Sequence, residues 1–265
     1  VVEMGVDRIH HGFWKHMDRL HPRHIPGNPF EGAIKHYYKQ VDAEIGSVLE
    51  LLPPETVVMV VSDHGARAMV GGICVNELLM REGFLTVRER PTRPTKLSRD
   101  QIDWSRTLAW GEGGYYSRIF LNVKGREPQG VIEPSDYEAV RDRLVSLLEG
   151  VTDEQGVNIG TKVHKPEQLF RTRNGIAPDL FVYFGDLSWR SVGSIGNDSI
   201  WTYDNDTGPD DANHDHLGIF ILQDPAHPRP GGQRLEGHQL YDIAPTVLHH
   251  LGMTPPADMI GRIIG

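Results

Sequence analysis

The sequence predicts an α/β fold, with a mostly parallel sheet flanked by helices. Four short runs of β-branched and aromatic residues, each bounded by turn residues, predict buried strands: 57–61, 119–123, 180–184 and 219–222. Three longer stretches with helical periodicity predict helices: 33–52, 136–150 and 241–252. Strands that alternate with helices are typical of α/β domains, which explains the expectation of a parallel sheet.

Residues at the ends of two predicted helices support these assignments. Ser135 and Asp136 stand where the second helix begins, and Gly150 stands where it ends. The third helix begins near Asp242 and ends at Gly252, with two prolines soon after it.

Two stretches lack a clear period. Residues 86–118 contain a segment rich in charge and proline, which predicts an excursion on the surface. Residues 186–213 are rich in Gly, Asp, Asn and Ser, and they predict a long loop before the next strand. Loops of this length in compact domains are often functional.

Composition restricts the classes of partner. The net charge of −9 over 265 residues argues against a nucleic-acid polymer, because phosphate backbones are bound by basic surfaces. It does not exclude a small phosphorylated substrate held by metal ions. No stretch approaches the ~20 apolar residues of a membrane span. The single cysteine, Cys74, favours a cytoplasmic over an extracytoplasmic location. N-terminal signals are not observable, and no pattern indicates the oligomeric state.

The first candidate site follows the strand at 57–61. Asp63, His64 and Gly65 come directly after this strand, so they place a carboxylate and an imidazole at the edge of the sheet where α/β proteins bind ligands. Asp and His together suit a divalent metal such as zinc. A helix cap or a simple turn is the structural alternative for so short a motif.

The second and third candidates lie at opposite ends of the sequence. Asp7 and His11 are four residues apart, which places both on one face of a helical turn. His214 and His216 precede the strand at 219–222, and either could reach a metal. His238 lies near the start of a helix, where it could face a phosphate or be structural.

For four further polar residues the sequence favours a structural role over a role in ligand binding. Tyr115 and Tyr116 stand in a glycine-rich loop and could approach a ligand, although a plain turn is favoured. Lys124 and Arg126 are predicted to be solvated surface charges, with a structural ion pair as the alternative.

These pieces together resemble the type I phosphodiesterase/nucleotide pyrophosphatase family of the alkaline phosphatase superfamily. The resemblance is carried by GVDRIHHGFW, VVSDHGA, IFLNVKGREPQG, APDLFVYF, NHDHLGIFIL and DIAPTVLHHLGMTPPADMIGRII, which follow the family's order over almost the whole chain. It implies an alkaline-phosphatase-like domain over residues 1–265, N-terminally incomplete, with an inserted region at about 86–165.

The resemblance also implies two divalent metal ions, with zinc favoured and manganese as an alternative. Asp7, His11 and His214 would hold one ion, and Asp63 and His64 would hold the other. His216 would then lie outside the ligand set. The family's remaining Asp ligand and its Thr or Ser nucleophile are expected upstream of Val1, and Ser62 does not occupy the nucleophile's place.

The implied activity is hydrolysis of phosphodiester or pyrophosphate bonds in a small phosphorylated, nucleotide-type substrate. Two alternatives remain open. One is a phosphomonoesterase, mutase or sulfatase-like member of the superfamily, and the other is a non-catalytic module that binds metal or phosphate.

Overall fold

The chain forms two compact units in its computed structural model, which describes residues 1–204, 210–228, 231–232 and 234–264. The first unit comprises Val1–Tyr38 and Ala66–Asp215, and the second comprises Lys39–Gly65 and His216–Gly265. An insertion at about 86–165 within a single domain stays a prediction.

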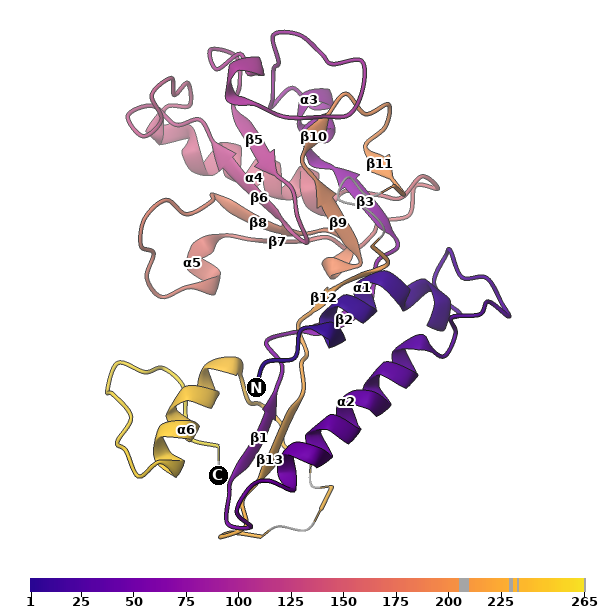
Figure 1. Cartoon of the computed structure of the whole chain (residues 1–265). Helices are drawn as coiled ribbons and strands as arrows, with labels where there is room; N and C mark the ends of the chain where they lie inside the picture. The colour runs from indigo at the N-terminus through magenta and orange to yellow at the C-terminus, as the bar shows by residue number, and fades with distance from the viewer. Residues whose placement is uncertain (205–209, 229–230, 233, 265) are drawn as a thin grey trace. The chain divides into compact units, whose positions relative to one another are not determined.

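The core of the first unit is a four-stranded antiparallel sheet (Figure 1). Its strand order is β5 (Ala109–Glu112), β6 (Ser117–Leu121), β8 (Leu180–Tyr183) and β7 (Lys162–His164). Alternate residues of β6 and β8 are buried, as the period of two in a strand requires: Ser117, Ile119, Leu121, Leu180 and Val182.

Helix α4 (Tyr137–Glu149) contributes the other half of this core. Val140, Leu144 and Leu148 recur every four residues along one face, and all three are buried in the same apolar cluster as the sheet. The helix follows a 3₁₀ turn, η2 (Pro134–Asp136), and its C-cap is Gly150. The helix predicted over 136–150 is therefore confirmed.

Shorter elements complete the first unit. Helix α1 (Gly5–Met17) opens the chain, and α3 (Val75–Arg81) and α5 (Pro166–Leu169) lie further along it. A three-stranded sheet joins β11 (Trp201–Thr202), β3 (Gly71–Cys74) and β9 (Trp189–Val192). Two strand pairs join β4 (Thr95–Lys96) with β10 (Ser194–Ile195), and β2 (Gly65–Ala68) with β12 (Ala212–Asp215). The remaining 3₁₀ turns here are η1 (Arg99–Gln101) and η3 (Phe184–Leu187).

Two expectations about the sheets change in the structure. The mostly parallel sheet is not confirmed. In the described residues β3 and β9 pair in parallel, whereas the three pairs of the four-stranded sheet and the pairs β1–β13, β4–β10 and β3–β11 are antiparallel. The single long loop predicted over 186–213 is wrong, because β9, β10 and β11 lie in that stretch and β12 begins in it. Each is two to four residues long, so no strand period could show in the sequence.

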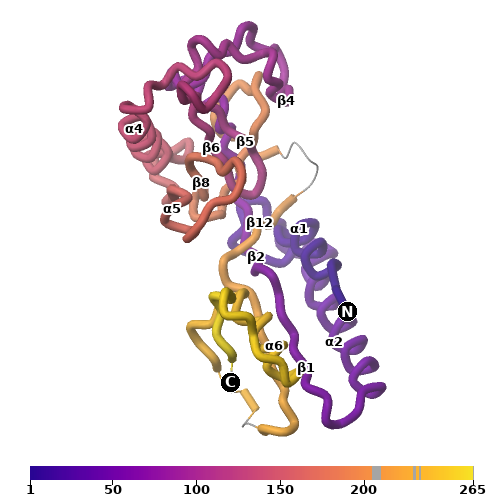
Figure 2. The backbone as a smooth tube through the Cα atoms, turned by 90° about the vertical axis from the view of Figure 1, so that its left-hand side faces the viewer, coloured from indigo at the N-terminus to yellow at the C-terminus, as the bar shows by residue number. Residues whose placement is uncertain are grey.

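The second unit contains the strand that precedes the Asp63-His64 motif. Strand β1 (Val58–Val61) pairs antiparallel with β13 (Phe220–Gln223), and Figure 2 follows both. Helix α2 (Ala33–Leu49) begins in the first unit and continues into this one. The unit ends with η4 (Leu240–Asp242) and α6 (Ile243–His250), close to the predicted helix bounds.

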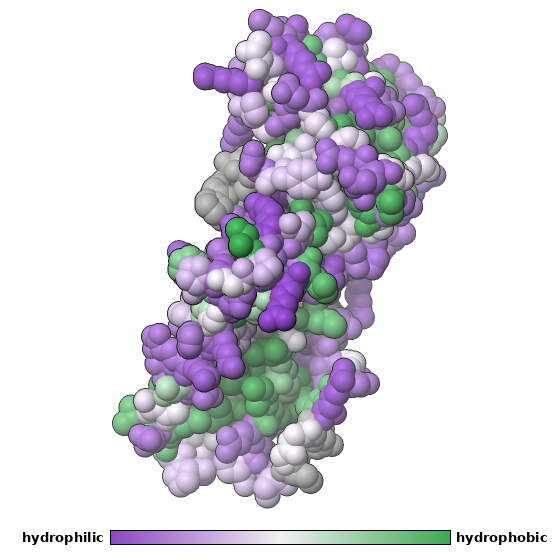
Figure 3. Space-filling view, turned by 90° about the vertical axis from the view of Figure 1, so that its right-hand side faces the viewer, coloured by the Kyte–Doolittle hydropathy of each residue, from purple (hydrophilic) through white to green (hydrophobic). Residues whose placement is uncertain are grey.

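Apolar residues remain exposed in the second unit. They include Leu51, Ile219, Ile221, Leu251 and Met253. Figure 3 shows an apolar area on the face of the molecule that it views. Within the described residues, no helix combines the length and the apolar character that a membrane crossing requires.

A buried carboxylate joins two of the quoted sequence motifs. Asp179 is 3% exposed, and the guanidinium of Arg126 donates to both of its oxygens, at 2.7 and 2.8 Å. The Tyr137 hydroxyl and the Leu121 amide also donate to this carboxylate, each at 2.6 Å. Arg126 is 42% exposed, so it stays in contact with solvent, but it also forms the structural ion pair that was the alternative.

Replacing Arg126 with methionine should destabilise the first unit. Loss of one partner of a fully buried ion pair costs about 3–5 kcal/mol. We expect the lower end, because Asp179 is buried but Arg126 is itself 42% exposed, and because Tyr137 and Leu121 still donate to Asp179. Urea unfolding measures the change. Lys124→Met is the matched control: its ion pair with Glu133 is half exposed, so the loss should stay below about 1 kcal/mol. Equal losses in both variants would contradict the assignment.

Candidate metal centre

Helix α1 presents the first two residues of the centre. Asp7 lies in the first turn of this helix and His11 lies one turn later, so their side chains share a face as their spacing predicts. The carboxylate of Asp7 also interacts favourably with the positive end of the helix dipole. Its side chain is 46% exposed, whereas that of His11 is 15% exposed.

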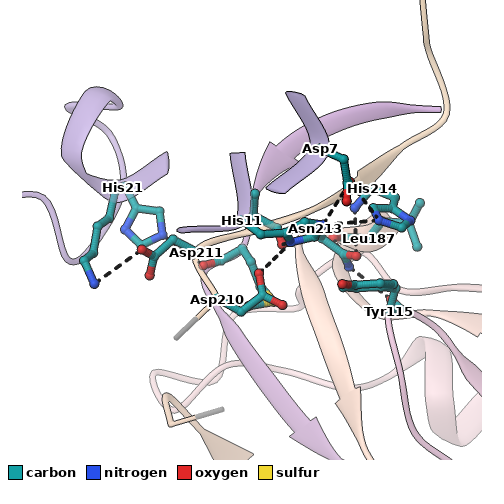
Figure 4. A network of polar contacts seen from close by, with 12 residues as sticks. Asp7, His11, His21, Tyr115, Leu187, Asp210, Asp211, Asn213 and His214 are labelled. Carbon is teal, nitrogen blue, oxygen red and sulfur yellow. Dashed lines mark hydrogen bonds and ion pairs between the residues drawn. The ribbon is translucent and has the colours of Figure 1, made fainter. Parts of the chain in front are cut away.

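Strand β12 brings the third residue from the other end of the unit. The residue directly before the strand, Asp211, docks on helix α1, because its amide donates to the His11 carbonyl at 2.8 Å. The fully buried Asp211 carboxylate pairs with Lys15 at 3.3 Å and with Arg23 at 2.7 Å. These contacts fix the strand against the helix, and His214 follows three residues later (Figure 4).

Three ligand atoms converge at this place. His11 Nε2 lies 3.2 Å from Asp7 Oδ1 and 3.3 Å from His214 Nε2, and His214 Nε2 lies 3.5 Å from Asp7 Oδ1. A tetrahedron with metal–ligand distances of 2.0–2.1 Å has edges of about 3.4 Å, so the spacing is that of three ligands around a zinc ion. The group formed by Asp7, His11 and His214, predicted from sequence, is therefore assembled in the structure.

The hydrogen bonds of His11 show why these atoms suit a cation. Its Nδ1 faces two acceptors, Asp210 Oδ1 at 2.7 Å and the Ala212 carbonyl at 2.9 Å, so this nitrogen carries the proton. In the neutral imidazole, Nε2 is then a lone-pair acceptor directed at another acceptor, the Asp7 carboxylate. A carboxylate behind a histidine is the usual outer partner of a metal ligand. The donor set therefore fits a divalent ion.

The electrostatics favour positive charge at the same point. The hydrogen bond that His11 donates to Asp210 is the main cause that raises the pKa of His11, burial opposes it, and the charges of Asp210 and Asp7 add to the increase. A proton and a metal ion would therefore compete for the same nitrogen.

Three supporting residues were not assigned to the centre from the sequence. Asn213 begins the quoted stretch around His214 and Asp210 lies three residues before it, but only the tertiary contacts reveal their roles. Asn213 is fully buried, and its amide donates to the carbonyls of Tyr115 at 3.0 Å and Leu187 at 2.7 Å. Tyr115 was noted as a loop residue, and its ring lies against both His11 and His214. The pattern of polar and apolar residues along the sequence does not indicate these contacts.

The remaining candidates belong to the second unit. Asp63 is exposed, and its Oδ2 lies 3.6 Å from Nε2 of the partly exposed His64, whose Nδ1 faces the Gly65 carbonyl at 2.9 Å. Their shared metal site stays a prediction. The Ser62 hydroxyl accepts a hydrogen bond from the Ile219 amide at 2.7 Å, which is a structural contact between β1 and β13.

The two other histidines considered from sequence are also in the second unit. His216 is exposed, two residues beyond His214. His238 precedes η4, and its Nδ1 lies 3.7 Å from the buried carboxylate of Asp242.

Comparison with known families gives one match. The model of the type I phosphodiesterase / nucleotide pyrophosphatase family matches residues 1–215, which contain all five residues of the two expected metal sites. The comparisons with curated proteins and with solved structures give no match.

Asp210→Asn should weaken metal binding without removing any ligand. Because the charged partner behind His11 is lost, we expect zinc affinity to fall roughly 10–100-fold. Calorimetric titration of chelator-treated protein measures it. Asp204→Asn, a neutralised aspartate on the surface of the same region, should bind zinc as the wild type does. An unchanged affinity in Asp210→Asn would contradict the role given to this carboxylate.

The same variant should reveal how the contribution of His11 to the free energy of unfolding depends on pH in metal-free protein. The folded pKa of His11 lies above the unfolded value of about 6.5, so its contribution to stability is present below that pH and is lost as pH rises through the folded pKa. The stability lost in Asp210→Asn should therefore be larger near pH 6 than near pH 9. Urea unfolding with chelator measures both losses, and equal losses would refute this.

Proposed function

The chain belongs to the type I phosphodiesterase/nucleotide pyrophosphatase family, and from this membership we propose that it hydrolyses phosphodiester or pyrophosphate bonds with two divalent metal ions. The observation that carries the proposal is the convergence of Asp7, His11 and His214 on one point. The substrate is a small phosphorylated molecule of nucleotide type. Zinc is the favoured metal because two imidazoles and a carboxylate make up the ligand set.

The residues of the proposed centre divide into ligands of two ions and a supporting carboxylate. Asp7, His11 and His214 would hold one ion, and Asp63 and His64 would hold the other. Asp210 keeps the proton of His11 on Nδ1, so that Nε2 remains a ligand. The partial exposure of Asp7 leaves a side of the first site from which a phosphoryl oxygen can approach. Catalytic zinc sites keep such an open position, whereas structural sites are closed.

The bound ions would polarise the phosphoryl oxygens and lower the pKa of an attacking hydroxyl or water. The two carboxylates of the expected sites, Asp7 and Asp63, offset part of the positive charge of the ions. Ser62 is not proposed as the nucleophile, because its hydroxyl already holds the Ile219 amide. The family's Thr or Ser nucleophile is therefore not assigned to any residue between 1 and 265.

Hydrolysis of bis(p-nitrophenyl) phosphate tests this proposal, with zinc content measured by mass spectrometry. His214→Ala removes a ligand, so we expect losses in zinc affinity and turnover that exceed the roughly 100-fold effect of losing an outer partner. His216→Ala is the matched control because this exposed histidine lies outside the ligand set. Its zinc content and turnover should equal those of the wild type.

Two outcomes would count against the hydrolase. Turnover that survives both chelation and His214→Ala would show that the centre is not used. Zinc bound at this centre without turnover of phosphodiesters would favour the non-catalytic metal-binding module.

A further inference from the structure

We propose that Tyr115 is a positioning residue of the metal centre, whose ring sets the orientation of the His11 and His214 imidazoles. This inference rests on the metal site of the proposed function. The three rings form a compact cluster. The centroid of Tyr115 lies 4.1 Å from that of His214 and 5.2 Å from that of His11, with interplanar angles of 37° and 25°. The two imidazoles lie 5.3 Å apart.

The contact is made through the faces of the rings. Offset and tilted stacking at these distances is favourable, and it restricts rotation of each imidazole about its χ2 torsion. Rotation of either ring would move Nε2 away from Asp7, which lies 3.2 Å from His11 Nε2 and 3.5 Å from His214 Nε2. The ring of Tyr115 therefore acts on the ligand atoms through the two histidines. Figure 4 shows it lying beside His214, on the side opposite Asp7.

The backbone that carries Tyr115 is fixed on both sides. Tyr115 lies between β5 and β6, and the preceding Gly114 exchanges two hydrogen bonds with Ser191 of β9, at 2.8 and 2.9 Å. Gly113 allows this close approach, because a Cβ there would lie 2.4 Å from the Gly193 nitrogen. The hairpin of the core sheet thereby places its tip against strand β9. The position of the Tyr115 backbone is fixed by this contact.

Asn213 connects the tyrosine directly to the strand of the metal ligand. Its amide donates to the Tyr115 carbonyl, and its side-chain oxygen accepts from the His214 amide at 2.8 Å. The same amide group donates to Leu187. A single buried side chain thus sets the spacing between the backbone of Tyr115 and the backbone of His214. The stacking distance follows from this spacing.

The neighbouring Tyr116 provides a control within the same loop. Its ring lies near Phe181 and Tyr183, with centroid distances of 6.0 and 5.8 Å, and it is 41% exposed. Tyr116 therefore shares the backbone environment and the residue type, but it contacts β8 instead of the histidines. A general disturbance of the hairpin would affect both tyrosines, whereas positioning of the ligands would involve Tyr115.

Binding of Co²⁺ to chelator-treated protein tests the proposal, by affinity and by the visible absorption spectrum of the bound ion. Tyr115→Leu should weaken Co²⁺ binding roughly tenfold and change the spectrum, since the imidazoles lose their common support. Tyr115→Phe keeps the ring and should restore both to within about twofold of the wild type. Tyr116→Leu should leave both unchanged. The spectrum reports ligand geometry, which a purely structural residue would not alter.

Each other result decides against one of the two proposals. Wild-type affinity and spectrum in Tyr115→Leu would overturn the role of Tyr115, as would equal weakening in Tyr116→Leu or in Tyr115→Phe. If far-ultraviolet circular dichroism shows that Tyr115→Leu does not fold, Tyr115→Met takes its place with the same expectations. A wild type that binds no Co²⁺, or binds it equally in His214→Ala, would instead refute the metal site itself.

Discussion

The docking of strand β12 on helix α1 is the contact on which the metal centre depends. Asp7 and His11 lie about 200 residues before His214, so no local interaction can bring them together. The Asp211 amide closes the distance by bonding the His11 carbonyl, and its buried carboxylate pairs with Lys15 and Arg23. Both the backbone and the side chain of Asp211 therefore bind residues of the N-terminal segment that contains helix α1. The neighbouring Asp210 then bonds the imidazole itself.

This arrangement places several hydrogen-bond acceptors next to one another, which is unfavourable when no donor or cation lies between them. Two imidazole nitrogens and a carboxylate oxygen meet within 3.5 Å, and a further carboxylate stands behind His11. Without a cation, such a group is stabilised by taking up a proton, which agrees with the raised pKa of His11. With a divalent ion, the same charges are neutralised directly. A divalent ion would therefore offset the repulsion among these acceptors, as the proposed function requires.

The sequence predicts those features of the centre that depend on residues close together in the chain. The i, i+4 spacing of Asp7 and His11 places them on one helical face, and the apolar runs locate β1, β6, β8 and β13. Asp210, Asn213 and Tyr115 could not be assigned, because their partners come from other elements and their types suit loops equally well. The expected parallel sheet is not confirmed, and the reason is similar: strand order and direction depend on contacts between distant segments. The five residues of the two sites were proposed from a family pattern, which carries such distant information indirectly.

The turn before β9 indicates how firmly one side of the centre is built. Gly185, Asp186 and Leu187 have φ values of 56°, 50° and 74°, a left-handed conformation that costs a non-glycine residue about 1–2 kcal/mol. Such strain persists only where the surroundings determine it. Arg67 holds the Asp186 carbonyl, Lys162 holds its carboxylate, and Asn213 holds the Leu187 carbonyl. Strain is therefore concentrated in the segment contacted by Asn213, which is next to His214 in the sequence, while the Asp7 side chain is 46% exposed. Rigidity on one side and access on the other is the arrangement that a metal-assisted reaction requires.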